Sequence, residues 1–266
     1  MNPQIQLMLQ QAIEAFHSGN FNSADLILRR VLRVDAKNLP ALHVLGLIKA
    51  SQENFKEAAD LLGRAARIHP NDASIQYNLA KALSDCGLDK ESIPHHKKAV
   101  QLAANNPEAW LNYGKSTSNL GRYADALVCY SKALDLKSDY AEAALNKGAT
   151  LKELKRYDEA ATCADQALLI NPNLAEAWSN KAVALKELKR YDEAITHYDK
   201  ALSLRPELSE PWSNKGVTLH ELKRYDEAIT HYDKALSLRA DHAESWSNKG
   251  VTLHELKRYD EAITHY

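Results

Sequence analysis

The chain repeats itself every 34 residues. The segment from Ser213 to Tyr232, SNKGVTLHELKRYDEAITHY, recurs letter for letter from Ser247 to Tyr266. Stepping by 34 residues divides the chain without insertions into seven full repeats and a last one of 24 residues. The repeats span residues 5–38, 39–72, 73–106, 107–140, 141–174, 175–208, 209–242 and 243–266. Such a period is typical of solenoids, in which each repeat buries its apolar surface against its neighbours.

Each repeat predicts two helices joined by a turn. In the sixth repeat, Trp178, Ala182 and Leu185 stand at positions 4, 8 and 11, the spacing of one apolar helix face. A second apolar face follows at Ala194, Tyr198, Ala201 and Leu204. Position 15, between the two faces, is glycine in three earlier repeats, which indicates a turn there. Small residues at positions 8 and 20 would let the two helices approach closely.

The residues at these positions resemble the signature of the tetratricopeptide repeat. In the sixth repeat they are Trp178, Ala182, Leu185, Tyr191, Ala194, Tyr198, Ala201 and Pro206. The resemblance covers residues 5–266. It implies an all-α fold, an α-solenoid of helix–turn–helix repeats that forms a right-handed superhelix with a concave groove. It also implies a polypeptide partner, held in that groove in an extended conformation.

Two features depart from the family pattern. Position 7, where leucine is expected, is lysine in the last four repeats, and we expect its stem to pack while its ammonium group reaches water. The third repeat departs further, because Gln76 replaces the tryptophan, Ser92 replaces the alanine and Pro94 falls inside the second helix. Proline removes a backbone hydrogen bond and kinks a helix, so we expect residues 73–106 to be the weakest repeat.

Position 6 of the first helix holds asparagine in six consecutive repeats. This asparagine row consists of Asn78, Asn112, Asn146, Asn180, Asn214 and Asn248. Positions 2, 6, 9 and 13 lie opposite the apolar face, so we expect them to line the groove. An asparagine side chain both accepts and donates hydrogen bonds, so the row can pair with the backbone of an extended peptide whatever its sequence. The alternative is that asparagine is common at this position and has no binding role.

Mostly acidic side chains are expected beside the row in the last four repeats. Position 13 supplies Glu153, Glu187, Glu221 and Glu255, and position 12 supplies Lys152, Lys186, His220 and His254. Position 2 is glutamate in the same four repeats. This excess predicts a preference for neutral or basic peptides that strengthens at low salt, unless the charges only solvate the surface.

The row by itself predicts weak binding. Six hydrogen bonds at about 1 kcal/mol each would contribute about 6 kcal/mol. Ordering a flexible peptide costs roughly 2–5 kcal/mol of that sum. The remainder suits a docking track and not a tight receptor.

Composition argues against several classes of protein. The 34 basic and 35 acidic residues leave a net charge of −1, whereas nucleic-acid binding favours a basic excess. No apolar stretch approaches the ~20 residues of a membrane helix, and no lysine or arginine precedes Arg29 to mark a signal peptide. Three scattered cysteines form no disulfide framework. We expect a cytoplasmic protein that binds neither nucleic acid nor membrane.

The sequence predicts neither a catalytic site nor a cofactor. It contains no Gly-rich phosphate loop, and the histidines of the later repeats recur at the repeat spacing. His197, His231 and His265 would lie ~10 Å apart on successive repeats, too far to ligate one metal ion. Cys129 and Cys163 share position 23 and are interpreted as packing residues.

The segment from Leu28 to Leu83 is similar to the N-terminal repeats of bacterial multidomain transferases, among them proteins resembling the O-GlcNAc transferase. The asparagine row also resembles the asparagine ladder of that enzyme, which guides substrate polypeptides to a catalytic domain. The short last repeat predicts that the chain is a fragment of a longer protein. Its open apolar end would then favour self-association.

Three functions remain open at this point. The chain is a protein-interaction scaffold acting through its groove, the substrate-docking region of a larger transferase, or a structural spacer with an idle groove.

Overall fold

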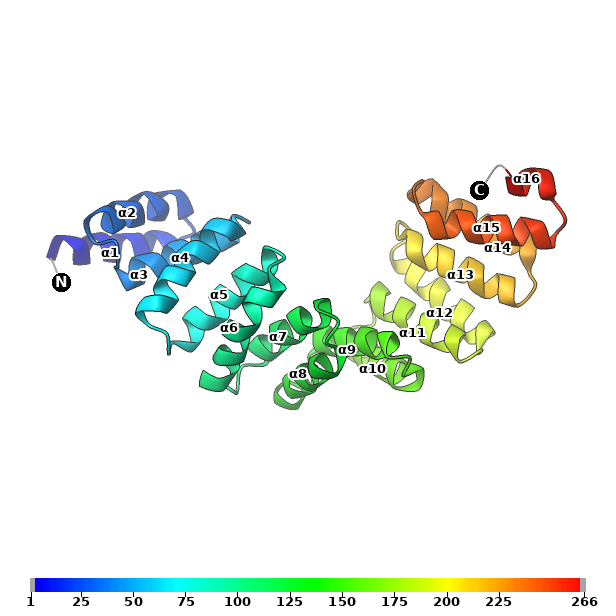
Figure 1. Cartoon of the computed structure of the whole chain (residues 1–266), viewed down its shortest axis with the longest axis horizontal. Helices are drawn as coiled ribbons and strands as arrows, with labels where there is room; N and C mark the ends of the chain where they lie inside the picture. Colours follow the sequence, from blue (N-terminus) through cyan, green and yellow to red (C-terminus); the bar gives the residue numbers. More distant parts are fainter. Residues whose placement is uncertain (1–2, 264–266) are drawn as a thin grey trace. The chain divides into compact units, whose positions relative to one another are not determined.

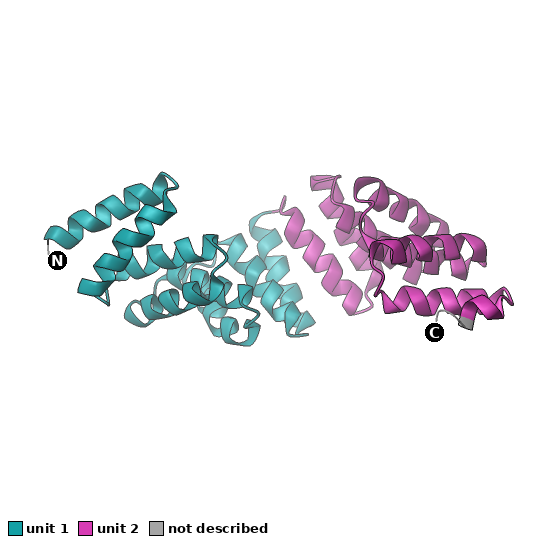
Figure 2. Ribbon diagram, turned by 90° about the horizontal axis from the view of Figure 1, so that it is seen from above, with its two compact units in different colours: residues 1–137 teal, residues 138–266 magenta. Residues whose placement is uncertain are grey.

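A computed structural model describes residues 3–263, which form sixteen helices and no strand (Figure 1). His265 and Tyr266 lie outside the described residues. The chain divides into two compact units, unit 1 (residues 1–137) and unit 2 (residues 138–266), coloured separately in Figure 2. The described residues thus form an all-α helical solenoid, as the sequence predicts.

The helices of unit 1 are α1 (Pro3–His17), α2 (Phe21–Val34), α3 (Leu39–Ser51), α4 (Phe55–Ile68), α5 (Ala73–Asp85), α6 (Asp89–Leu102), α7 (Pro107–Asn119) and α8 (Tyr123–Leu136). Those of unit 2 are α9 (Ala141–Glu153), α10 (Tyr157–Ile170), α11 (Ala175–Glu187), α12 (Tyr191–Leu204), α13 (Ser209–Glu221), α14 (Tyr225–Leu238), α15 (Ala243–Glu255) and α16 (Tyr259–Ile263). Odd-numbered helices are the first helices of their repeats and even-numbered ones the second.

Within each unit the first helices form the tighter layer. In unit 1, α3 contacts both α1 and α5, and α5 contacts α7. In unit 2, α11 contacts α9 and α13, and α13 contacts α15. Second helices of successive repeats within a unit do not approach each other as closely in the described residues. The first helices therefore make the shorter, inner side of each unit.

The turn at position 15 has the backbone conformation that the glycines indicate. Gly87 has φ 74°, and Lys189, at the same position, has φ 60°. The next backbone N–H reaches back to close the helix, since Arg190 N donates to Leu185 O at 2.9 Å. The turn is thus confirmed for glycine and lysine alike, although lysine adopts this conformation at a cost of about 1 kcal/mol.

Small residues at position 8 set the distance between the two helices of a repeat. A Cβ on Gly216 would lie 2.6 Å from the ring of Tyr232, and one on Gly114 would lie 2.6 Å from the ring of Tyr130. Both tyrosines are buried. The expected close approach is confirmed, because the glycine leaves the space that the ring fills.

The third repeat keeps the fold despite its substitutions. Gln76 Nε2 donates to Pro70 O at 2.8 Å, as Trp178 Nε1 donates to Pro172 O at 2.8 Å three repeats later. Helix α6 runs from Asp89 through Pro94 to Leu102 as one helix. The low stability expected of this repeat stays a prediction.

The sequence predicted that the ammonium groups of the position 7 lysines reach water, but three of the four lie beside an aspartate. Lys181 Nζ lies 2.6 Å from Asp165, Lys215 Nζ lies 2.6 Å from Asp199, and Lys249 Nζ lies 2.7 Å from Asp233. Each pair joins a first helix to the second helix of the preceding repeat. The pairing was missed because it requires residues 16 positions apart in the sequence to be neighbours.

Candidate functional site

The asparagine row lies on the first-helix layer of both units. Unit 1 contributes Asn78 from α5 and Asn112 from α7. Unit 2 contributes one asparagine from each first helix, namely Asn146, Asn180, Asn214 and Asn248. All six side chains are half-buried. Because neighbouring first helices within a unit are in contact, the amides at position 6 follow one another along one face, which we call the first-helix face.

In unit 1 the asparagines are already hydrogen-bonded. Asn78 Nδ2 lies 3.1 Å from His43 Nε2 and 3.4 Å from Ser74 Oγ. Burial lowers the pKa of His43, so the neutral ring can accept this bond. Asn112 Nδ2 donates to the hydroxyl of Tyr77 at 3.0 Å. The amide donors of unit 1 therefore serve the fold.

In unit 2 most of the row has no partner. Asn180 Oδ1 accepts a hydrogen bond from Lys152 Nζ at 3.3 Å. In the part of the chain that the structure describes, no group bonds to the side-chain amides of Asn146, Asn214 or Asn248. The six positions are equivalent in the sequence, but the structure separates them into two sets.

The charged residues predicted beside the row lie at the far end of the first helices. Glu153, Glu187, Glu221, Glu255 and His254 are exposed, whereas Lys152, Lys186 and His220 are half-buried. Positions 12 and 13 are roughly 10 Å along the helix from position 6, at 1.5 Å per residue. Lys152 reaches the row by extending to the next first helix. Lys186 instead pairs with Glu187 at 2.9 Å, and His220 Nδ1 lies 2.9 Å from Thr252 Oγ1.

Two arginines reduce the acidity of this face. Arg205 lies 2.6 Å from Glu176 and 2.9 Å from Glu207, and Arg239 lies 3.7 Å from Glu210. The acidic excess predicted from the sequence was counted at positions 2, 12 and 13 of the first helices, so it did not include these arginines, which follow a second helix. The preference for basic peptides stays a prediction, and this pairing weakens its basis.

Each unit has a hollow beside an asparagine of the row. In unit 1 a hollow of about 580 Å³ takes in Asn78 and lies between α3 and α5. Its other lining residues are mostly apolar and include Leu47, Ala50, Phe55 and Tyr77. In unit 2 a hollow of about 340 Å³ takes in Asn180 and lies between α11 and α13. Polar residues line it, including Glu176, Ser179, Glu207, Glu210 and Arg239.

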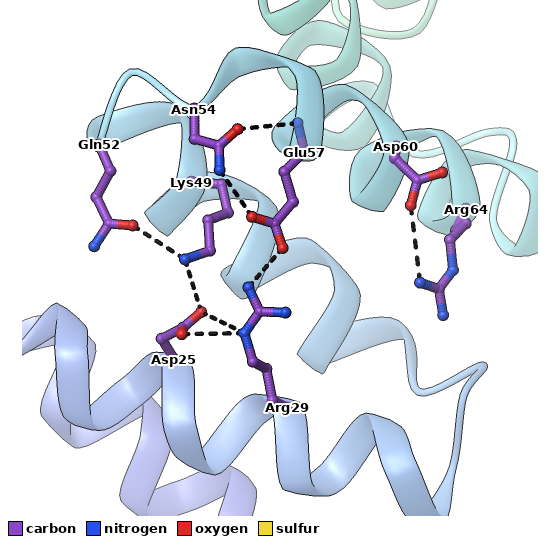
Figure 3. Close-up of polar contacts among 8 residues, drawn as sticks. All are labelled: Asp25, Arg29, Lys49, Gln52, Asn54, Glu57, Asp60 and Arg64. Carbon is purple, nitrogen blue, oxygen red and sulfur yellow. Dashed lines mark hydrogen bonds and ion pairs between the residues drawn. The ribbon is translucent and has the colours of Figure 1, made fainter.

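A polar network fixes the α3–α4 turn next to the hollow of unit 1 (Figure 3). Lys49 is only 8% exposed, and its Nζ lies 3.0 Å from Asp25 and 3.1 Å from Gln52. Arg29 bridges Asp25, at 3.1 Å, and Glu57, at 2.6 Å. Because these residues come from α2, α3, α4 and the turn, the network holds the edge on which Ala50 and Phe55 stand.

The described residues include no group of three or more His, Cys, Asp or Glu side chains placed to hold a metal ion. His197 stacks on Trp178 with ring centroids 5.3 Å apart, and burial lowers the pKa of both His197 and His231. The three cysteines are free, and Cys129 and Cys163 are buried. No helix among residues 3–263 is long and apolar enough to span a membrane.

Comparison with protein families finds the same repeat along nearly the whole chain. Models described as tetratricopeptide repeat match residues 9–73, 43–107, 141–174, 175–208 and 207–266. A model described as TPR repeat matches residues 119–155. No curated protein matches the chain significantly in sequence.

Solved structures share the fold. A tetratricopeptide repeat protein from Parabacteroides merdae ATCC 43184 has a TM-score of 0.68 at 17% identity, over 94% of this chain and 98% of that one. YrrB, described as a TPR protein with an unusual peptide-binding site, has a TM-score of 0.59 at 22% identity, over 72% and 98%. A MamA structure from Desulfovibrio magneticus RS-1 has a TM-score of 0.59 at 24% identity, over 64% and 96%.

Proposed function

Because the chain belongs to the tetratricopeptide repeat family, we propose that it is a protein-interaction scaffold that binds extended polypeptide segments on its first-helix face. The observation that carries this proposal is the set of unpartnered, half-buried amides of Asn146, Asn214 and Asn248. A peptide backbone offers such an amide both a C=O and an N–H group. The peptide-binding site named in the description of YrrB, which shares the fold, also supports the proposal.

Unit 2 has the features of a weak, sequence-tolerant track. Four asparagines at about 1 kcal/mol per hydrogen bond contribute about 4 kcal/mol, and ordering the peptide costs roughly 2–5 kcal/mol. The amides alone therefore hold a peptide no better than about millimolar, and side-chain contacts must supply the rest. With helices ~9 Å apart and ~3.3 Å per extended residue, three gaps correspond to a segment of about 8 residues.

The test is to select binders of the whole protein from a displayed library of random 12-residue peptides. Dissociation constants of the recovered peptides are then measured by fluorescence anisotropy. Replacing Asn146, Asn180 and Asn214 together by alanine should weaken binding at least tenfold for peptides of unrelated sequence. Ser203→Ala with Ser237→Ala, exposed on second helices α12 and α14, is the matched control and should leave affinity unchanged. Unchanged affinity in the asparagine variant would count against the proposal.

Substrate docking for a larger transferase is a second candidate. The run of six asparagines favours it, because a weak and sequence-tolerant track suits an enzyme with many protein substrates. The coding sequence downstream of the Tyr266 codon tests it. A transferase domain encoded there would support this candidate, and a stop codon directly after Tyr266 would contradict it.

A further inference from the structure

The hollow of unit 1 has a more apolar lining than the hollow of unit 2. It measures about 580 Å³, within the range of ligand pockets. Leu47, Ala50, Phe55 and Tyr77 line it, and all four are half-buried. Asn78 stands at its edge. An apolar hollow beside a backbone-binding group is the arrangement that would hold one side chain of a bound peptide.

The hollow is open because position 12 of the second repeat is alanine. Unit 2 has longer side chains at this position, namely Lys152, Lys186, His220 and His254. Lys152 shows their effect, since its Nζ extends over to Asn180 on the next first helix. The facing residue at position 5 also differs, because unit 1 has Tyr77 where unit 2 has Ser179 and Ser213. The same place is thus open and mostly apolar in unit 1, whereas Lys152 and His220 reach across to the next first helix in unit 2.

The charges at the rim favour a neutral occupant. Lys81 Nζ lies 2.8 Å from Asp85, so each neutralises the other. Glu53, on the turn, is the remaining charged lining residue. An acidic side chain placed over Leu47 and Phe55 would lose its water without gaining a partner, and a basic one could pair only with Glu53, which is exposed and so contributes little. An apolar side chain gains by burial.

Asn78 supplies the backbone contact that an extended occupant needs. Its Nδ2 is directed to His43 and Ser74, so its donor is already used. No group among the described residues donates to its Oδ1. That oxygen remains available for a backbone N–H of a peptide whose neighbouring side chain enters the hollow.

We propose that this hollow is an anchor pocket for one large apolar side chain, of the leucine or phenylalanine class, of an extended peptide bound to the first-helix face. This inference rests on the proposed function and adds a preference that the asparagine row cannot supply. Unit 1 thus selects a peptide by the anchor, whereas the asparagines of unit 2 bind a peptide with little regard for its sequence.

The test uses blocked amino acids, which carry one side chain and two peptide groups. N-acetyl-leucinamide and N-acetyl-phenylalaninamide are titrated into the whole isotope-labelled protein. The polar probes are N-acetyl-lysinamide and the α-amide of N-acetyl-aspartic acid, whose side-chain carboxyl group is free. The two apolar probes should shift the backbone amide signals of Ala50, Tyr77 and Asn78 at least fivefold more than the polar probes do. Equal shifts from all four probes, or none at these residues, would overturn the proposal.

Variants of Ala50 distinguish the effect of filling the hollow from the effect of adding a charge to it. Ala50→Lys introduces the residue of repeats five and six, and Ala50→Gln fills the hollow without a charge. Both should reduce the shifts caused by the apolar probes at least fivefold, whereas Ala104→Lys, in an exposed turn of unit 1, should leave them unchanged. Undiminished shifts in both Ala50 variants, with circular dichroism matching the unchanged protein, would contradict the anchor pocket.

The failure of this inference and that of the proposed function give different results. If library peptides bind through the asparagines of unit 2 but the apolar probes do not bind at Ala50, the anchor pocket fails and the scaffold remains. If the apolar probes bind at Ala50 but no library peptide depends on the asparagines, the pocket stands and the peptide track fails.

Discussion

Units 1 and 2 build the same helical hairpin with different interactions. In unit 1 five helices begin at an asparagine or aspartate whose side chain accepts a hydrogen bond from the first turn. In unit 2 none of the helices α9 to α15 has such a bond, and α10, α12 and α14 begin at an arginine. That arginine pairs with a glutamate three residues on, as Arg190 does with Glu193 at 2.7 Å. One hairpin geometry thus tolerates two ways of starting a helix.

The packing within the two units also differs, since unit 1 has a larger apolar cluster and unit 2 has more polar contacts between repeats. One apolar cluster of unit 1 runs through several repeats, from Ile5 to Ala82. Unit 2 has smaller clusters, such as the one around Leu219 and Tyr232, together with lysine–aspartate pairs between successive repeats. Unit 1 carries 16 basic and 13 acidic residues, a net charge of +3, whereas unit 2 carries 18 and 22, a net charge of −4. The comparison teaches that unit 1 depends on apolar burial and unit 2 more on repeated polar contacts.

Removing apolar volume from unit 1 should have the largest effect. Leu28, at position 24, is fully buried, and Leu28→Ala should destabilise unit 1 by about 3 kcal/mol. The fifth repeat has Ala164 at this position, also buried, so unit 2 tolerates the residue that unit 1 should not. Hydrogen exchange followed by mass spectrometry reports the two units separately. Leu26→Ala, 60% exposed on the same helix, is the control, and an equal effect of both variants would contradict the expectation.

Acid should weaken unit 1 through His96, which occupies the buried position 24 of the third repeat. Burial and, to a lesser extent, nearby His95 lower its pKa to about 4 against the opposing charge of Asp85. Its Nε2 lies 3.1 Å from Ser84 Oγ. The unfolded chain takes up a proton on this ring near pH 6.5 and the folded chain only near pH 4, so stability falls as pH drops through this window. The shift corresponds to about 3 kcal/mol.

Denaturant unfolding at a series of pH values checks this dependence. His96→Leu, which places the residue of the first two repeats at position 24, should flatten the profile between pH 6.5 and pH 4. His17→Gln, at an exposed position of α1, should not. If stability depends on pH in the same way in His96→Leu and in the unchanged protein, then His96 is not the source of the acid sensitivity.

Exchanging the turn residues of the two units should shift their stabilities in opposite directions. Gly87→Ala should cost about 1–2 kcal/mol in unit 1, since φ there is 74° and a Cβ would meet no other atom within 4 Å. Lys189→Gly should stabilise unit 2 by about 1 kcal/mol, because φ is 60°. Thermal unfolding monitored by circular dichroism measures both. A stabilising Gly87→Ala would show that backbone strain does not govern this turn.

The smallest effect concerns the helix starts and would sharpen the comparison further. Asn106 Oδ1 accepts a hydrogen bond from Ala109 N at 3.0 Å, and Asn106→Ala should cost about 1 kcal/mol. Arg190→Ala should have no measurable effect, because both side chains of the pair that it forms with Glu193 are exposed to water. Comparable losses in local hydrogen-exchange protection of α7 and α12 would show that the two kinds of helix start are equivalent.

Much of the fold follows from local patterns. The repeat spacing predicts two helices at the same offsets in each repeat, and Gly87 indicates a turn that Lys189 also makes. The small residues at position 8 are also visible in the sequence. Each of these features depends on residues within one hairpin, so a single repeat carries enough information to predict it.

The candidate site was only half predictable. The sequence identified the asparagine row because its period is visible. It did not separate Asn78, bonded to His43, from Asn146, whose side-chain amide has no partner among the described residues, nor did it find the hollow beside Ala50. Such differences arise where residues 28–35 positions apart meet, and the identity of one position does not reveal what its neighbour on the next helix reaches.

The sequence by itself therefore determined the repeat, the helices, their turns and the face on which the asparagines lie, because short-range hydrogen bonding and apolar periodicity control them. Only the tertiary structure decided which amides remain available, which lysines pair with aspartates and where a side chain leaves a hollow. Those outcomes depend on how far each side chain extends across the gap between packed helices.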